Sequence, residues 1–201
     1  MRRSFNHELA QLIQQIETLA SRLPGPFVVA IDGRSGSGKS TLAAHMATRL
    51  NAAVLSGDDF FAGGVTVRHL PPATLADICI DWRKQREVLT LLKANGTASY
   101  FPFDWAAFDG SQEPLPRSVA PRPVILFEGV YTARPELRDL VDLLVLVEVP
   151  ERRRLRQLRE REGEIRAWDR QWLQAEDWYF VTVSPRNLFD IILSPDDVRQ
   201  R

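Results

Sequence analysis

The chain has 201 residues, of which 44% are hydrophobic and 26% are charged, and its 26 basic residues balance its 26 acidic residues. This composition is typical of a globular protein, and a chain of this length can bury roughly 70% of the surface that its unfolded form exposes. The balanced charge disfavours nucleic acid as the main partner, because binding to a duplex usually requires a basic excess.

Cys79 is the only cysteine, so an internal disulfide is excluded and a cytoplasmic protein is predicted. Polar side chains recur throughout residues 1–20, where a signal peptide would need an apolar core. No apolar run reaches the length of about 20 residues that a membrane-spanning helix needs. We therefore predict neither a signal peptide nor a membrane partner.

Helical and strand patterns alternate along the chain. Apolar residues at helical spacing predict an N-terminal helical segment within residues 1–23. Short apolar runs typical of buried parallel strands occupy residues 27–31, 53–55, 124–127, 143–147 and 191–193. Further helices are predicted at residues 38–50, 82–92, 151–161 and 165–181. Residues 60–80 and 102–123 are rich in proline or glycine, so we predict long loops there.

A glycine-rich motif lies between the first predicted strand and the next helix. Residues 33–40 read Gly-Arg-Ser-Gly-Ser-Gly-Lys-Ser and satisfy the pattern G-x-x-x-x-G-K-[ST]. The glycines let successive backbone N–H groups turn inward, and the helix that follows adds the positive end of its dipole. The motif predicts that ATP is bound by Gly33, Arg34, Ser35, Gly36, Ser37, Gly38, Lys39, Ser40 and Thr41.

The alternation of strands and helices, together with this motif, predicts the fold and two chemical roles. We predict an α/β fold of the P-loop NTPase type, with a parallel sheet, helices on both faces and a single domain over residues 1–201. Lys39 is expected to reach the β- and γ-phosphates, and the Ser40 hydroxyl is expected to ligate Mg²⁺.

Carboxylates follow two of the predicted strands. Asp58 and Asp59 come after the second strand, and Glu128 ends the run at residues 124–127. We predict Asp58 to be the catalytic base that accepts the proton of an acceptor hydroxyl, with Asp59 as the alternative. Glu128 is predicted to be catalytic and to bind Mg²⁺ together with Ser40. Turn formation by the aspartates is the simpler explanation that stays open.

Arginines crowd the helix predicted at residues 151–161. Helical spacing places Arg152, Arg156 and Arg159 on one face, and we predict Arg156 and Arg159 to be catalytic within a lid at about residues 151–166. A solvated helix with local ion pairs is the alternative.

Aromatic residues mark a candidate site for the phosphate acceptor. Phe103, Asp104 and Trp105 offer a stacking surface with a polar anchor, and Asp81 is a further candidate for binding the acceptor. Aromatic residues also commonly fill a core, so this alternative stays open.

Taken in order, these motifs resemble the uridine kinase and phosphoribulokinase family. The resemblance is carried by residues 30–41, 58–61, 103–105 and 127–130 and by the arginine-rich segment after Pro150. It implies a fold like that of nucleoside kinases. It also implies ATP-dependent phosphorylation of a sugar or nucleoside hydroxyl, with Asp58 as base, Asp81 as a ribose-binding carboxylate, and Phe103 and Asp104 in the acceptor pocket. Members that act on nucleosides tend to have Tyr where this chain has Phe103, and the phenyl ring cannot donate a hydrogen bond.

The sequence thus predicts a kinase that transfers the γ-phosphate of ATP to a hydroxyl of a nucleoside or similar small molecule. A kinase for a sugar or a vitamin, such as pantothenate or nicotinamide riboside, is a second hypothesis. An ATP-binding module that senses nucleotide with little turnover is a third, and a homo-oligomer is left open. An ATPase coupled to nucleic acid is disfavoured by the balanced charge.

Overall fold

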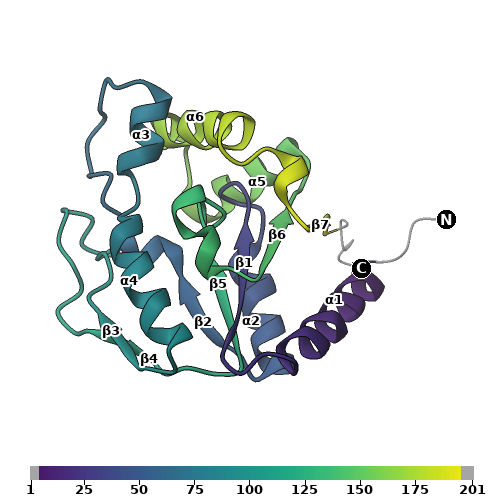
Figure 1. Cartoon of the computed structure of the whole chain (residues 1–201). Coiled ribbons are helices and arrows are strands. Elements are labelled where there is room, and N and C mark those ends of the chain that lie inside the picture. Colours follow the sequence, from purple (N-terminus) through teal and green to yellow (C-terminus); the bar gives the residue numbers. More distant parts are fainter. Residues whose placement is uncertain (1–4, 196–201) are drawn as a thin grey trace.

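Five short strands form a parallel sheet at the centre of the protein (Figure 1). The structure, a computed structural model, describes residues 5–195, so the predicted positions 1–4 and 196–201 lie outside the described residues. The strands lie in the order β2-β5-β1-β6-β7. Their bounds are β1 Phe27–Asp32, β2 Ala53–Ser56, β5 Val124–Glu128, β6 Leu143–Val147 and β7 Ile191–Leu193. All five predicted strands are confirmed.

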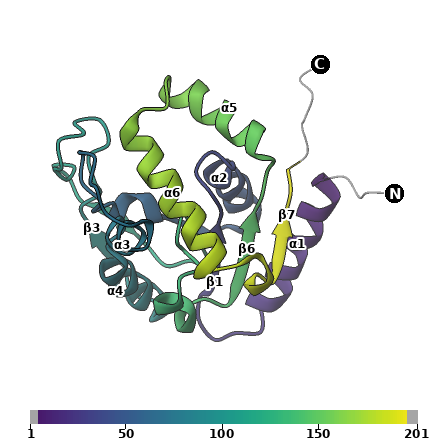
Figure 2. The same cartoon turned by 90° about the horizontal axis from the view of Figure 1, so that it is seen from above.

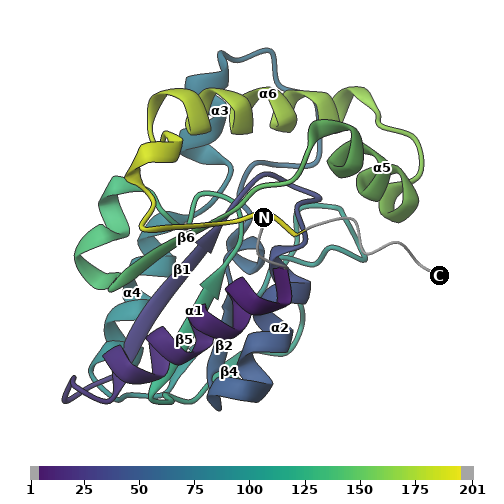
Figure 3. The ribbon, with the colours of Figure 1, turned by 90° about the vertical axis from the view of Figure 1, so that its right-hand side faces the viewer.

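Helices cover both faces of this sheet, because successive side chains of a buried strand point to opposite faces. Phe27, Val29 and Ile31 of β1 pack against α1 (Phe5–Ala20) and α2 (Lys39–Leu50). Val28 and Ala30 point the other way, into a core shared with α4 (Trp82–Lys93) and with the 3-10 helix η2 (Pro135–Leu140). The predicted layered α/β fold is therefore confirmed (Figure 3).

A third group of helices lies over the carboxyl ends of the strands. It consists of α3 (Pro72–Ile78), α5 (Glu151–Glu162) and α6 (Ala167–Thr182), with α6 crossing above the sheet (Figure 2). The short 3-10 helices η1 (Gly57–Phe60) and η3 (Arg186–Leu188) complete the helical elements of residues 5–195. Helices in this position create space between themselves and the strand ends, which is where ligands bind in parallel α/β folds.

The two long loops predicted from the sequence contain regular structure. Residues 60–80 include α3, which begins at Pro72 and buries Leu75 and Ala76. Residues 102–123 include β4 (Arg117–Val119), which pairs antiparallel with β3 (Ala98–Tyr100). Both elements are too short for periodicity to reveal, and contacts with distant segments stabilise them. No helix within residues 5–195 has the length and apolar character needed to cross a membrane.

Candidate active site

The phosphate-loop motif adopts a backbone that glycine permits. Gly36 and Gly38 have φ values of 79° and 93°, in the left-handed region that other residues avoid. Lys39 begins α2, is only 6% exposed, and donates from Nζ to the carbonyl oxygen of Arg34 at 3.2 Å. The hydroxyl of Ser37 is buried without a hydrogen-bond partner among residues 5–195. A buried hydroxyl that lacks a protein partner fits a loop shaped to bind an anion.

Asp32 anchors the start of this loop. Its fully buried carboxylate accepts hydrogen bonds from the backbone N–H of Gly33 at 2.7 Å, Tyr131 at 3.0 Å and Ala133 at 2.9 Å, and from the Tyr179 hydroxyl at 2.9 Å. Burial raises the pKa of Asp32 to about 6, although these hydrogen bonds and the charge of Lys39 oppose the rise. One carboxylate thus joins the phosphate loop, the segment after β5 and helix α6.

Sheet register brings the predicted carboxylates together. Ser56 lies opposite Glu128 in the β2–β5 pair, so the acids that follow β2 emerge beside the end of β5. Ser40 donates its hydroxyl to Glu128 Oε2 at 3.0 Å. Burial raises the pKa of Glu128, and the nearby charge of Asp58 raises it further. The two residues predicted to bind Mg²⁺ are therefore in direct contact.

Asp58 and Asp59 have different surroundings. The carboxylate of Asp59 is buried and accepts hydrogen bonds from the Tyr100 hydroxyl at 2.7 Å and from Arg117 Nη1 at 2.6 Å. These bonds fasten η1 to the β3–β4 pair. Both aspartates line an open cavity of about 640 Å³, but only Asp58 is exposed. The contacts of Asp59 leave Asp58 as the better placed of the two to meet a ligand.

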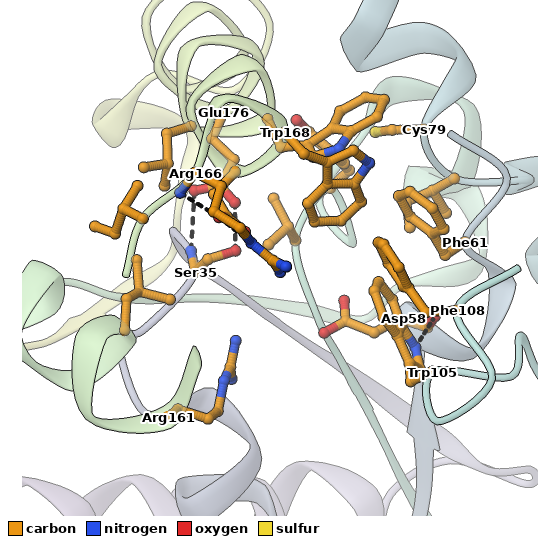
Figure 4. Close-up of a pocket in the computed structure, with 18 of the residues that line it drawn as sticks. Ser35, Asp58, Phe61, Cys79, Trp105, Phe108, Arg161, Arg166, Trp168 and Glu176 are labelled. Carbon is orange, nitrogen blue, oxygen red and sulfur yellow. Dashed lines mark hydrogen bonds and ion pairs between the residues drawn. The ribbon is translucent and has the colours of Figure 1, made fainter. Parts of the chain in front are cut away.

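The cavity lies between the strand ends and helix α6 (Figure 4). Ser35 of the phosphate loop and Glu176 of α6 line one side, and aromatic side chains line the other. Asp58 and Arg166 also point into this space (Figure 4). The aromatic residues of the lining are Phe61, Trp105, Phe108, Tyr131, Trp168 and Trp172.

Most of the predicted acceptor residues do not reach this cavity. Trp105 lines it and donates its indole N–H to the carbonyl oxygen of Asp58 at 3.3 Å. Phe103 is buried behind the wall, in edge contact with Phe61 and Trp105. Asp104 accepts from the backbone N–H of Ala106 at 2.9 Å, which stabilises a turn. Asp81 caps α4 through the N–H of Lys84 at 3.2 Å and is not part of the cavity lining.

The arginine face chosen from the sequence is not the face that meets the phosphate loop. Arg156 and Arg159 border a separate surface depression with Arg152 and Glu160, and the Arg156 side chain is 63% exposed. Residues 154, 158 and 161 form the inward face, since Arg154 and Leu158 are buried and Leu158 and Arg161 line the cavity. The contacts therefore give no support to the predicted catalytic role of Arg156 and Arg159. The apolar Leu158 is the signal in the sequence for the face that packs against the loop.

Several site residues were not identified from the sequence. They are Arg154, Arg161, Arg166, Phe108, Trp168, Trp172 and Glu176. Trp168 and Trp172 lie in the helix predicted at residues 165–181, and their spacing there indicates only a helix. Their position at the cavity follows from the path of α6 over the sheet, which no local pattern encodes.

Comparison with solved structures identifies the fold. A candidate fructose transport system kinase from Silicibacter sp. TM1040 aligns over 92% of this chain and 98% of its own, with a TM-score of 0.69 and 25% identity. A candidate uridine kinase from Bacillus stearothermophilus aligns over 91% and 99%, with a TM-score of 0.64 and 24% identity. The chain has the fold of the P-loop kinases.

A third structure extends this likeness to another kind of kinase. D-glycerate 3-kinase from Cryptococcus neoformans aligns over 94% of this chain and 96% of its own, with a TM-score of 0.61 and 15% identity. No protein-family model matches the sequence. The resemblance to uridine kinase-like proteins is confirmed in the fold, whereas the three named proteins differ in the acceptor that their names imply.

The contact between α5 and the phosphate loop gives a first testable expectation. A Cβ atom added to Gly36 would lie 2.8 Å from the carbonyl oxygen of Arg154 and 2.8 Å from Cγ of Leu158. We expect Gly36→Ala to lower the free energy of unfolding by about 1–3 kcal/mol more than Gly110→Ala does. Gly110 is the matched control because its φ is similarly positive and nothing lies within 4 Å of its added Cβ. Equal losses in urea denaturation would contradict the packing of α5 on the loop.

Proposed function

We propose that this protein is an ATP-dependent phosphotransferase that phosphorylates a hydroxyl of a ring-containing small molecule, such as a nucleoside. The observation that carries the proposal is the cavity itself, which runs from Ser35 of the phosphate loop past Asp58 to a wall of aromatic side chains. A donor phosphate at the loop and an acceptor against the wall would both lie beside the same carboxylate. The balanced charge of the chain supports a small molecule, rather than nucleic acid, as the partner.

The residues of the loop fit a magnesium nucleotide. Curled glycines, a buried lysine and an unsatisfied serine hydroxyl suit the phosphates. The Ser40 hydroxyl and the Glu128 carboxylate are hard oxygen ligands in contact with each other, and Mg²⁺ is typically bound by one or two such groups together with substrate phosphates. A bound Mg²⁺ would neutralise charge on the phosphate oxygens.

Asp58 supplies the acid–base chemistry in this proposal. Its carboxylate takes the proton of the acceptor hydroxyl as the hydroxyl oxygen forms a bond to the γ-phosphorus, while the bond from that phosphorus to the β–γ bridging oxygen breaks. The products are a phosphate ester and ADP. Lys39 and the arginines at the cavity stabilise the negative charge that develops on the transferred group.

The aromatic wall supports an acceptor that carries a flat ring. Trp105 is 44% exposed although it is large and apolar, and its hydrogen bond to the Asp58 backbone holds the indole beside the catalytic carboxylate. The buried indole N–H of Trp172, another lining residue, has no hydrogen-bond partner within residues 5–195. A ring that stacks against these indoles, with an oxygen for the free N–H, suits the space better than a small acid or an unmodified sugar would.

ADP release with a panel of acceptors tests this proposal. The panel should contain nucleosides, hexoses, glycerate, pantothenate and nicotinamide riboside, and each acceptor-dependent rate should be compared with hydrolysis in its absence. We expect turnover with a ring-containing member. Turnover with a hexose alone would favour a sugar kinase, in line with the name of the Silicibacter structure. Tight binding of ATP without turnover for any acceptor would favour the nucleotide-sensing module.

Trp105→Ala is expected to separate acceptor binding from nucleotide binding. Removing the exposed indole deletes part of the acceptor wall, so the KM for the acceptor should rise about tenfold, as expected for the loss of one stacking contact worth about 1–1.5 kcal/mol. The KM for ATP should stay near that of the unaltered protein. Phe101→Ala is the control, because Phe101 is similarly exposed but does not line the cavity. An unchanged acceptor KM would remove Trp105 from the acceptor site.

A further inference from the structure

Ser35 of the phosphate loop is held by side chains from two helices. Its backbone N–H donates to Glu176 Oε2 at 3.0 Å, and its hydroxyl donates to Glu176 Oε1 (Figure 4). Arg154 Nη1 donates to the backbone carbonyl oxygen of Ser35 at 3.5 Å. Both backbone polar groups of Ser35 are therefore engaged by α5 and α6, which follow the loop by more than 100 residues.

The two side chains that hold Ser35 are themselves a buried pair. Each is 5% exposed, and Arg154 Nη1 lies 3.9 Å from Glu176 Oε2. Burial raises the pKa of Glu176, and the charges of Lys39 and Arg154 oppose that rise. A buried ion pair contributes little net stability, because desolvation of the two charges offsets their attraction. Its main consequence here is to fix where the two groups lie.

Gly36, the next residue of the loop, packs closely against α5. Gly36 has no room for a side chain between the loop and α5, as the short contacts of an added Cβ demonstrate. Arg154 is therefore held against the loop from the α5 side, and Glu176 reaches the same loop from α6. The sequence motif alone does not include either contact.

We propose that Glu176 is a positioning residue for phosphoryl transfer, which fixes Ser35 in the phosphate loop and holds the Arg154 guanidinium against that loop. The catalytic part of this inference rests on the proposed function. A cation fixed at the loop by a buried carboxylate is in place before the reaction begins, so no reorganisation is needed when charge develops on the phosphoryl group. Glu176 acts through Ser35 and Arg154 and needs no contact with the acceptor.

The kinetic test uses Glu176→Gln. The amide oxygen can still accept one hydrogen bond from Ser35, so ATP should bind with little change in KM. The charge that orients Arg154 is lost, and kcat should fall about tenfold or more, since small displacements of catalytic groups carry costs of this order. Asp139→Asn is the matched control, because it removes the carboxylate of the surface pair Arg86–Asp139, which does not line the cavity. An unchanged kcat in Glu176→Gln, or a loss confined to thermal stability, would overturn the proposal.

A double variant distinguishes positioning from a separate contribution. If Glu176 acts through Arg154, adding Glu176→Gln to Arg154→Met should lower kcat by much less than Glu176→Gln does alone. Full additivity of the two losses would count against the coupling. This comparison is unaffected by a general loss of stability, because the rates are referred to folded protein.

Hydrogen–deuterium exchange tests whether Glu176 fixes the phosphate loop, and it requires no turnover. In Glu176→Gln, amides of both the phosphate loop and α5 should exchange faster than in the unaltered protein, while Asp139→Asn should change neither. Unchanged exchange in these two segments would overturn the positioning role even for an active enzyme. If no acceptor supports turnover, the proposed function fails and this exchange experiment still decides whether Glu176 fixes the loop.

Discussion

Asp58→Asn is expected to lower kcat by about 10² or more, the usual cost of losing a general base, while binding of ATP persists. The substitution keeps the shape of the side chain and removes its ability to take up a proton. Asp58 is exposed in the cavity, and its backbone oxygen is the partner of Trp105, so the amide variant should disturb neither the fold nor the aromatic wall. Steady-state kinetics and a direct nucleotide-binding measurement together check this expectation.

Asp59→Asn provides the contrast. Its carboxylate accepts bonds from Tyr100 and Arg117, so this variant should lower thermal stability and affect kcat far less than Asp58→Asn does. Burial raises the pKa of Asp59, and the hydrogen bond from Tyr100 and the charge of Arg117 oppose that rise. Full activity in Asp58→Asn, or a larger catalytic loss in Asp59→Asn, would reverse the assignment of the base.

The sheet and the phosphate loop could be predicted because their signals are local. Each buried strand is a continuous apolar run, and the loop is a fixed pattern between a strand and a helix. Placement of Asp58 and Glu128 at one edge followed from the parallel order of the strands. The register that sets Ser56 opposite Glu128 then brings these acids together.

The remaining parts of the site depend on contacts between distant segments. In α5, six arginines offered several plausible faces, and only Leu155 and Leu158 hinted at which one is buried. Glu176 looks no different in sequence from its neighbour Asp177, yet the former is buried against Ser35 and the latter pairs with Arg34 at the surface. Phe103 and Asp104 read as pocket residues, whereas the local fold uses them for packing and for a turn.

Lys39→Met is expected to lower turnover by about 10² to 10³, since it removes a fixed positive charge from the phosphate site. The variant should also change how stability depends on pH. Three buried carboxylates, those of Asp32, Glu128 and Glu176, have pKa values raised by burial and opposed by the charge of Lys39. Without that charge, the pKa of each carboxylate in the folded protein should rise further.

The sign of the pH effect follows from proton linkage. At pH values above the raised pKa values, which include about 6 for Asp32, the folded variant must hold ionised carboxylates without their cation, and its deficit in stability relative to the unaltered protein is largest. As the pH falls towards about 4, the carboxylates bind protons in the folded state and the deficit should shrink. Thermal denaturation of both proteins between about pH 4 and pH 8 measures this difference. Lys93→Met is the control, because it removes a lysine that pairs with Asp142 outside the cavity and contacts none of the three buried carboxylates. If the stability deficit of Lys39→Met is the same at every pH tested, Lys39 does not stabilise the ionised form of these carboxylates. A purely steric loss of stability would not depend on pH.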